Sequence, residues 1–537
     1  MAEVVLIGLL FFVFAGGPTP DVNEAHYLAK AKHYWNPEWC PRDHFLDSAD
    51  AHLVFNWTFG WLTLLLPLPA VAWTGRLLTW GLLAWAWQRL SAAVAPWRLM
   101  SLLSAAILIL LVRDFNFAGE WLVGGVEAKG FAFVLVLLGL EALVRDRWRT
   151  VWPLLGAAAA FHVLVGGWSV IAAGAAWVWR GRGRPGIVAM LPALLAGLLL
   201  ALPGLIPGVR LSLGVEVDVV RQANRIYVFE RLSHHLAPHA FPELWWIRWI
   251  RHGALLAVWG GLCVATWRME AVRRVSGFVA GAVLIGFCGL AIDAATHVTR
   301  SQDLAATLLR FYWFRLSDVA LPLGTALGAC SLIAHWRDTR RPAGDAALIA
   351  TMLLAGAGIG VVVYQRQLDP RPAADAQGLP VVDDPQIRRR MYEDWINVCR
   401  WIREETPPDA TFITPRWQQT FKWYAQRSEV VSHKDVPQDA RSLVDWKKRM
   451  RVLYRRYRDD DGRVKAGLAA YDDKNLAILA HYFDAQYIVV DRTRSRHRPG
   501  FTLVYPNGLF ENETYAVYRV PAPPDDKPSA PPDEEES

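Results

Sequence analysis

Long runs of apolar residues without a single charge are the feature that most constrains this sequence. Three examples are Leu99–Val112, Ile187–Ile206 and Ala346–Val363. A helix rises about 1.5 Å per residue, so about 20 apolar residues are enough to cross about 30 Å of hydrocarbon. Of the 537 residues, 53% are hydrophobic and only 20% are charged, whereas soluble domains carry roughly 25% charged residues. The sequence therefore predicts a polytopic α-helical membrane protein.

Eleven segments have the composition of membrane-spanning helices. They are Val4–Ala15, Arg76–Val94, Leu99–Val112, Gly130–Val144, Val151–Val165, Gly166–Trp179, Ile187–Ile206, Gly253–Trp267, Ser276–Ala295, Ser317–His335 and Ala346–Tyr364. A further apolar segment, Leu53–Trp73, contains Pro67 and Pro69, and we expect it to lie bent at the membrane interface. The basic connectors between the spans then all fall on the cytoplasmic side, as the positive-inside rule requires.

This topology predicts three regions. Residues 1–364 form a transmembrane domain with a large first external loop at 16–52, residues 365–520 form an external soluble α/β domain, and residues 521–537 form a disordered acidic and Pro-rich tail. In the soluble domain we expect strands at Thr411–Thr414, Gln486–Val490, Phe501–Val504 and Thr514–Val520, and helices at Pro385–Glu405, Trp417–Arg427, Asp439–Tyr457 and Asp473–Phe483. The expected location is a bacterial inner membrane, with the C-terminal domain on the periplasmic side.

The net charge of +7 does not indicate a nucleic-acid partner. From Gln365 to the end, 28 Lys and Arg residues balance 28 Asp and Glu residues, so the first 364 residues carry the other 29 bases and 22 acids. A basic excess confined to short loops between apolar spans is what membrane topology produces. Nucleic-acid binding is therefore not expected.

The first external loop is rich in groups that can perform acid–base chemistry. Its acids are Asp21, Glu24, Glu38, Asp43, Asp47 and Asp50, and four histidines accompany them. A carboxylate directly after a first membrane span sits at the lipid–water boundary, where it can meet a lipid-linked phosphate and deprotonate an acceptor hydroxyl. An ordinary solvated loop is the alternative.

The same region resembles the GT-C integral-membrane glycosyltransferases. The resemblance rests on the acidic cluster followed by His26-Tyr27-Leu28, on the Pro-broken apolar stretch and on the Gly75-Arg76 pair that opens the next span. The chain is also similar to uncharacterised bacterial membrane proteins grouped as a domain of unknown function. The family pattern has an Asp as the proposed base where this sequence has Asn23. The resemblance therefore implies that Glu24 or Asp21 takes the catalytic role.

Further candidates lie in later external connectors. The resemblance implies that Glu120, Glu127 and Lys129 face the active site, although Glu127 can instead cap a helix N-terminus. Lys129 is too close in sequence to face Glu127 along one helix. Phosphate binding is expected from a basic set, because arginine forks bind phosphate in a bidentate manner: Arg225, Arg231, His234, His235, Arg310 and Arg315. Arg315 can alternatively pair with Asp318, and we expect His162 to be hydrogen-bonded inside the helix bundle.

The favoured function is the transfer of a sugar from a polyprenyl-phosphate donor to an acceptor on the external face. The partners would be membrane lipid and the lipid-linked sugar. No dissociable cofactor is required, and a divalent cation is expected only if Glu24, Glu120 or Glu127 converge. The alternatives are a non-catalytic membrane scaffold or binding protein and a transporter. A transporter is disfavoured because the spans show no paired halves.

Overall fold

A computed structural model describes residues 1–181, 183–242, 246–378, 384–458, 464–493, 498–508 and 511–522. The chain divides into two compact units. The first unit comprises Met1–Gly16, Ala51–Phe55 and Thr74–Leu368, and the second comprises Gly17–Asp50, Asn56–Trp73 and Asp369–Ser537. The first loop therefore packs with the C-terminal part of the chain. The predicted tail lies almost entirely outside the described residues, since these end at residue 522.

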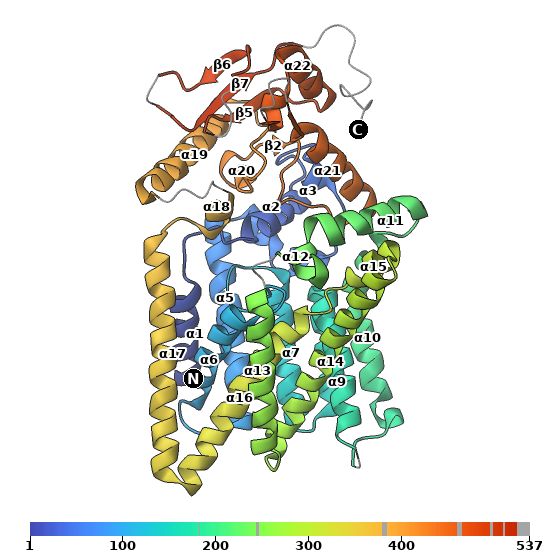
Figure 1. The fold of residues 1–537 in the computed structure, drawn as a ribbon, viewed down its shortest axis with the longest axis vertical. Coiled ribbons are helices and arrows are strands. Elements are labelled where there is room, and N and C mark those ends of the chain that lie inside the picture. The colour runs from blue at the N-terminus through green and yellow to red at the C-terminus, as the bar shows by residue number, and fades with distance from the viewer. Residues whose placement is uncertain are drawn as a thin grey trace. The chain divides into compact units, whose positions relative to one another are not determined.

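The first unit is a bundle of helices, many of which run side by side (Figure 1). Its helices are α1 (Ala2–Ala15), α5 (Leu68–Val94), α6 (Met100–Phe115), α7 (Ala128–Val144), α8 (Trp148–Phe161), α9 (Val163–Trp179), α10 (Ile187–Arg210), α11 (Val217–Arg225), η2 (Ile226–Arg231), α12 (Ser233–Leu236), η3 (Pro238–Ala240), α13 (Trp246–Ala265), α14 (Glu270–Val298), α15 (Gln302–Leu309), α16 (Arg315–Thr339) and α17 (Arg341–Leu368). Helix α5 begins in the part of the chain assigned to the second unit and continues into the first.

Four helices among the described residues are long and apolar enough to cross a membrane, namely α10, α14, α16 and α17. Helices α1 and α9 are apolar but shorter. Of the four long helices, α16 is buried along most of its length, whereas most of α17 faces outward. The chain is thus a helical membrane protein, and the full count of eleven spans stays a prediction.

Glycines allow α8 and α10 to approach closely. A Cβ atom added to Gly156 of α8 would lie 2.0 Å from the carbonyl oxygen of Gly197 in α10, and one added to Gly204 would lie 2.5 Å from the carbonyl oxygen of Ala159. Both distances are far below a van der Waals contact. Small residues at such positions are the usual means by which membrane helices pack backbone against backbone.

The apolar segment Leu53–Trp73 is not a continuous helix. It consists of α4 (Leu53–Thr58), the 3-10 helix η1 (Gly60–Leu64) and the first turns of α5, which begins just after Pro67. Several of its large side chains are exposed, namely Trp57, Trp61, Leu64, Leu65 and Leu66. A broken segment that exposes tryptophan and leucine has the character of an interfacial element rather than of a span.

We expect topology reporters inserted after His52 and after Thr74 to report the same side of the membrane. The physical reason is that the chain breaks twice between these points and does not complete a helix long enough to cross about 30 Å. Cysteine accessibility to a membrane-impermeant reagent would measure this. Opposite labelling of the two positions would contradict the prediction and would invert the side assigned to every later loop.

The second unit combines the first loop with a small mixed sheet. Its helices are α2 (Glu24–Trp35), α3 (His44–Asp47), α18 (Ala373–Gly378), α19 (Pro385–Glu405), α20 (Phe421–Ala425), α21 (Ala440–Leu453), η5 (Gly467–Ala470) and α22 (Asp473–Tyr482). Its strands are β1 (Thr411–Ile413), β2 (Ser428–Glu429), β3 (Arg456–Arg458), β4 (Val464–Ala466), β5 (Tyr487–Asp491), β6 (Thr502–Tyr505) and β7 (Tyr515–Arg519).

The main sheet has the strand order β2-β1-β5-β7-β6. Strand β1 pairs in parallel with β2 and β5, whereas β7 pairs antiparallel with β5 and β6. Helix α19 covers a core that contains Trp395, Phe412, Phe421 and Val489. These apolar side chains come from elements that the sequence pattern predicts, and they form the core of a small C-terminal sheet. The unit is larger than the predicted 365–520, since it also contains Gly17–Asp50 and Asn56–Trp73.

Two predicted helices are wrong in extent. The helix expected over Asp439–Tyr457 ends at Leu453, because Tyr454 donates its hydroxyl to the carbonyls of Thr414 and Val431 and the chain then enters β3, which pairs with β4. The helix expected over Trp417–Arg427 shrinks to α20, which stops where Gln426 adopts a left-handed backbone conformation.

Candidate active site

The connector Asn116–Glu127, between α6 and α7, is fixed by a buried carboxylate from α16. Asp318 is fully buried and accepts backbone N–H groups from Phe117 at 2.7 Å, from Ala118 at 2.9 Å and from Glu120 at 3.3 Å. A carboxylate that accepts several backbone amides holds a loop in one conformation. Asp318 therefore sets the position of Glu120.

Glu120 is the centre of a buried ion cluster. One of its carboxylate oxygens accepts from Lys129 Nζ, and the other lies 2.5 Å from Arg315 Nε. The side chains of Glu120 and Lys129 are only 5% and 7% exposed. Burial alone would raise the pKa of Glu120, but Lys129 and Arg315 lower it to about 2. Glu120 is therefore a carboxylate at neutral pH.

Glu127 belongs to the same cluster. Lys129 Nζ lies 3.2 Å from Glu127 Oε1. The two side chains meet because Glu127 precedes the first residue of α7 and has an extended backbone, so they do not lie along one helix. Burial and the neighbouring Glu120 raise the pKa of Glu127, whereas Lys129 acts against this rise.

Arg315, the first residue of α16, carries the cationic face of the cluster. Its guanidinium donates to His162 Nε2 at 3.0 Å and lies over the ring of Tyr312 at 4.0 Å. The suggested pairing of Arg315 with Asp318 is wrong, because Arg315 binds Glu120 while Asp318 binds backbone amides. His162 is hydrogen-bonded inside the bundle as expected. Its partner is Arg315, so His162 lies next to the ion cluster of Glu120.

The other predicted binding residues divide into two groups. His235 lies beside the connector, since its Nδ1 donates to the carbonyl of Ala118. Burial lowers the pKa of His235 to about 3, so the ring is neutral. Arg310 instead binds the side chain of Asn224 and Arg225 binds Asp303. Among the described residues, Glu120 pairs with Lys129 and Arg315 and not with either of these arginines.

Arg231 and His234 are half-buried. The ring of His234 lies 4.0 Å from that of His235, measured between centroids. Arg231 ends the π-helical turn η2, and His234 stands in α12. His234 therefore lies next to His235, the residue that donates to the connector.

The predicted bases lie in the second unit, at the start of α2. Glu24 is fully buried, and its carboxylate accepts the backbone N–H of Asp21 at 2.7 Å. Asp21 is half-buried and accepts the N–H of Val22. The expectation of an exposed interfacial carboxylate at Glu24 is wrong, because α2 packs within the second unit.

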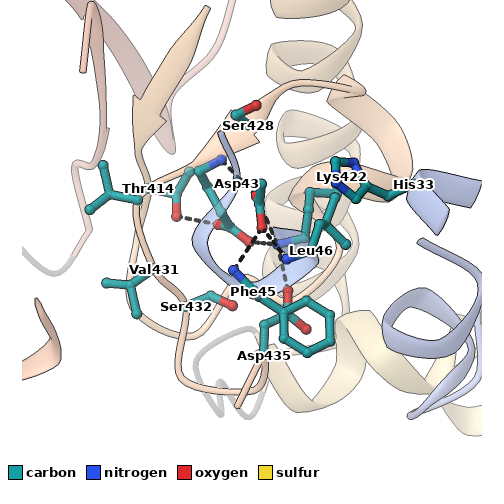
Figure 2. Close-up of polar contacts among 12 residues, drawn as sticks. His33, Asp43, Phe45, Leu46, Thr414, Lys422, Ser428, Val431, Ser432 and Asp435 are labelled. Atoms are coloured by element: carbon teal, nitrogen blue, oxygen red, sulfur yellow. Dashed lines mark hydrogen bonds and ion pairs between the residues drawn. The ribbon is translucent and has the colours of Figure 1, made fainter. Parts of the chain in front are cut away.

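A second buried ion cluster lies around Lys422 of α20, and we call it the lysine cluster (Figure 2). Lys422 Nζ lies 2.5 Å from Glu429, 2.6 Å from Asp435 and 3.5 Å from Asp43. All three carboxylates are buried. Asp43 also accepts the backbone N–H of Glu429, across 386 positions of sequence. This cluster joins the first loop to the C-terminal segment within one compact unit.

Sequence reasoning missed Asp318, Lys422, Glu429 and Asp435 as site residues, and it placed Asp43 only among the loop acids. Each of these five is buried with a charged or backbone partner far away in sequence. A carboxylate in the first turn of a long helix that is mostly apolar is the one local signal, and it applies to Asp318.

The side chains around Glu120 and Glu127 do not fit a divalent cation. The described residues contain no group of three or more His, Cys, Asp or Glu side chains that could hold a metal ion. Two of the three carboxylates considered as cation ligands, Glu120 and Glu127, share the ammonium group of Lys129. The ammonium group of Lys129 supplies the positive charge that a metal ion would supply between these two carboxylates.

Replacing Asp318 by Asn should lower the free energy of unfolding by about 2 kcal/mol, since hydrogen bonds to a buried charged group contribute roughly 1.5–3 kcal/mol. Thermal unfolding in detergent would measure the loss as a lower Tm. Asp338 lies on the same helix and is exposed, so Asp338→Asn is the matched control and should leave Tm unchanged. An unchanged Tm in Asp318→Asn would contradict the role given to this carboxylate.

Comparisons with known proteins give one family match and several similar solved structures. A family described as a domain of unknown function (DUF6798) matches residues 393–453, which include Lys422, Glu429 and Asp435. No curated protein sequence matches the chain.

Two solved structures of an oligosaccharyltransferase from Archaeoglobus fulgidus align with this chain. The archaeal enzyme AglB in complex with an inhibitory peptide and a dolichol-phosphate aligns over 91% of this chain and 69% of that chain, with 11% identity and a TM-score of 0.42. The complex with Zn and sulfate aligns over 91% of this chain and 68% of that chain, with 11% identity and a TM-score of 0.38.

Proposed function

We propose that this chain is a GT-C-like membrane glycosyltransferase that moves a sugar from a polyprenyl-phosphate donor to an acceptor on the external face of the membrane. The proposal rests on one observation above all. Glu120, in the connector between α6 and α7, contacts two cations, the buried Lys129 and the half-buried Arg315. Burying charges costs several kcal/mol per ion, so such a cluster is a candidate functional site.

The proposed roles follow from the chemistry of each group. The acceptor oxygen or nitrogen attacks the anomeric carbon, the bond from that carbon to the phosphate oxygen breaks, and the acceptor proton passes to a carboxylate base. Glu24 is the candidate base and Asp21 the alternative. Arg315 and Lys129 stabilise the negative charge on the departing lipid phosphate, as fixed cations do in a site from which water is excluded.

Arg315 has a geometry that suits a phosphate. Its planar guanidinium presents donors in a fixed fork, and the ring of Tyr312 supports one face of it. His162 accepts one of its N–H groups. Glu120 holds Arg315 in the absence of an anion, and a phosphate can compete for the same guanidinium.

The direct test is incubation of the purified protein with a panel of polyprenyl-phosphate sugars, followed by measurement of released lipid phosphate. We expect release from at least one donor, and we expect Arg315→Gln to reduce it by about 10²-fold. Arg221 is exposed and pairs with Asp218, so Arg221→Gln is the matched control and should leave release unchanged. Absence of release from every donor would contradict the proposed function and would favour the scaffold alternative.

A further inference from the structure

Helix α2 begins at the candidate base and is fixed two residues later by the C-terminal segment. His26 Nδ1 lies 3.0 Å from Asp435 Oδ1, and Asp435 is only 2% exposed. The ring of His26 also packs against Phe45, with the two centroids 4.3 Å apart. All of these residues belong to the second unit.

The direction of this hydrogen bond can be assigned. Burial would raise the pKa of Asp435, but Lys422 and His26 lower it, so its carboxylate is ionised. An ionised carboxylate only accepts hydrogen bonds, and therefore His26 Nδ1 must donate. Lys422 Nζ lies 2.6 Å from Asp435 and holds its carboxylate in the position that accepts this hydrogen bond.

A second fixing point lies one turn further along α2. Lys30 is 9% exposed and donates to the carbonyls of Phe45 and Ser48 and to the Ser48 hydroxyl, at 2.5–2.8 Å. His26 and Lys30 are four residues apart and so lie on one face of the helix. This face is therefore fixed at two points, and the first of them is next to Glu24.

We propose that Asp435, held by Lys422, is a positioning residue that sets the location of Glu24 through His26. The inference rests on the proposed function, because it assigns to the lysine cluster the task of orienting the candidate base. It also gives a role to the contact between His26 and Asp435, which lie 409 positions apart in the sequence.

The test replaces Asp435 by Asn in the full-length protein. Asn keeps the shape of the side chain and an oxygen that can accept from His26, but it removes the negative charge that pairs with Lys422 and strengthens the hydrogen bond from His26. We expect hydrogen–deuterium exchange of the backbone amides in Asp21–Trp35 to become about tenfold faster. With an active donor, kcat should fall by about 10²-fold while KM stays within about twofold, because a small displacement of a reacting group costs rate rather than binding.

A matched control separates positioning from general loss of structure. Asp394 is a buried carboxylate of the same unit that accepts from the backbone and side chain of Thr514. Asp394→Asn should lower Tm without changing exchange in Asp21–Trp35 or kcat. If it changes kcat as much as Asp435→Asn does, the positioning role is wrong.

Two substitutions of His26 test the hydrogen bond itself. His26→Ala removes the donor and should reproduce the effects of Asp435→Asn. His26→Asn places an N–H donor close to the position of Nδ1, and we expect it to recover at least half of the lost protection from exchange. Equal effects of the two substitutions would overturn the proposal.

The outcomes also distinguish this inference from the proposed function. A wild-type protein that releases no lipid phosphate contradicts the transferase, while exchange in Asp21–Trp35 still decides whether Asp435 fixes α2. If Glu24→Gln abolishes turnover but Asp435→Asn changes neither kcat nor exchange, the transferase stands and the positioning role is overturned.

Discussion

Replacing Lys422 by Met should lower the free energy of unfolding of the second unit by about 3–5 kcal/mol, the cost of leaving a buried charge without its partner. The ammonium group of Lys422 lies within 4.0 Å of three carboxylates, those of Asp43, Glu429 and Asp435, and all three are buried. Without the ammonium group they would repel one another in a medium that screens charge poorly. Thermal unfolding of the protein in nanodiscs, followed by limited proteolysis of the second unit, would measure the loss.

Lys474 provides a matched control, because it lies in the same unit and is exposed. Lys474→Met should change stability by less than about 0.5 kcal/mol. The double variant Lys422→Met with Glu429→Gln should recover part of the loss, since it removes one of the uncompensated charges while the new amide oxygen can still accept from Thr414. A single Lys422→Met variant as stable as the wild type would show that the cluster contributes nothing to the fold.

The second large effect is expected from Glu24→Gln. Turnover should fall by roughly 10²–10⁴, the range typical of losing one general base. The amide oxygen of Gln can still accept the N–H of Asp21, so the turn before α2 should persist. Release of lipid phosphate, measured on the donor that the panel identifies, would give the ratio of kcat values.

Asp21→Asn separates the two candidate bases. If it abolishes turnover while Glu24→Gln does not, Asp21 is the base and the resemblance has been carried over to the wrong acid. Exchange in Asp21–Trp35 should match the wild type in both variants, which excludes a displaced helix as the cause. An established activity that neither variant alters would rule out catalysis by the first loop.

Much of the fold could be predicted from local patterns. The uncharged run at Ile187–Ile206 predicts α10, whose apolar side chains are mostly exposed, as in a helix that faces lipid. The apolar stretch at Gln486–Val490 predicts β5, which is buried at every position. The prolines Pro67 and Pro69 likewise indicate the break before α5, since proline interrupts a helix at the preceding residue.

The candidate site was predictable only in part. Glu120, Glu127, Lys129 and Arg315 follow from their residue types at the ends of spans, but which of them pair depends on contacts between α7, α16 and the connector. The two-residue strand β2 carries Glu429, a residue with no preference for strands, and its place in the sheet comes from pairing with β1. Such information is in the tertiary structure and in no short window of sequence.

The discontinuous second unit has a consequence for the synthesis of the protein. Asp43, His26 and Lys30 leave the ribosome early, whereas Lys422 and Asp435 follow after all the helices of the first unit have been made. At about 5–20 residues per second, this delay lasts roughly 20–80 s. During that time Asp43 lacks the ammonium group of Lys422 and His26 lacks the carboxylate of Asp435. The unit can close only when the chain is nearly complete, so a ribosome that stops early releases a product whose N-terminal loop stays open to proteases.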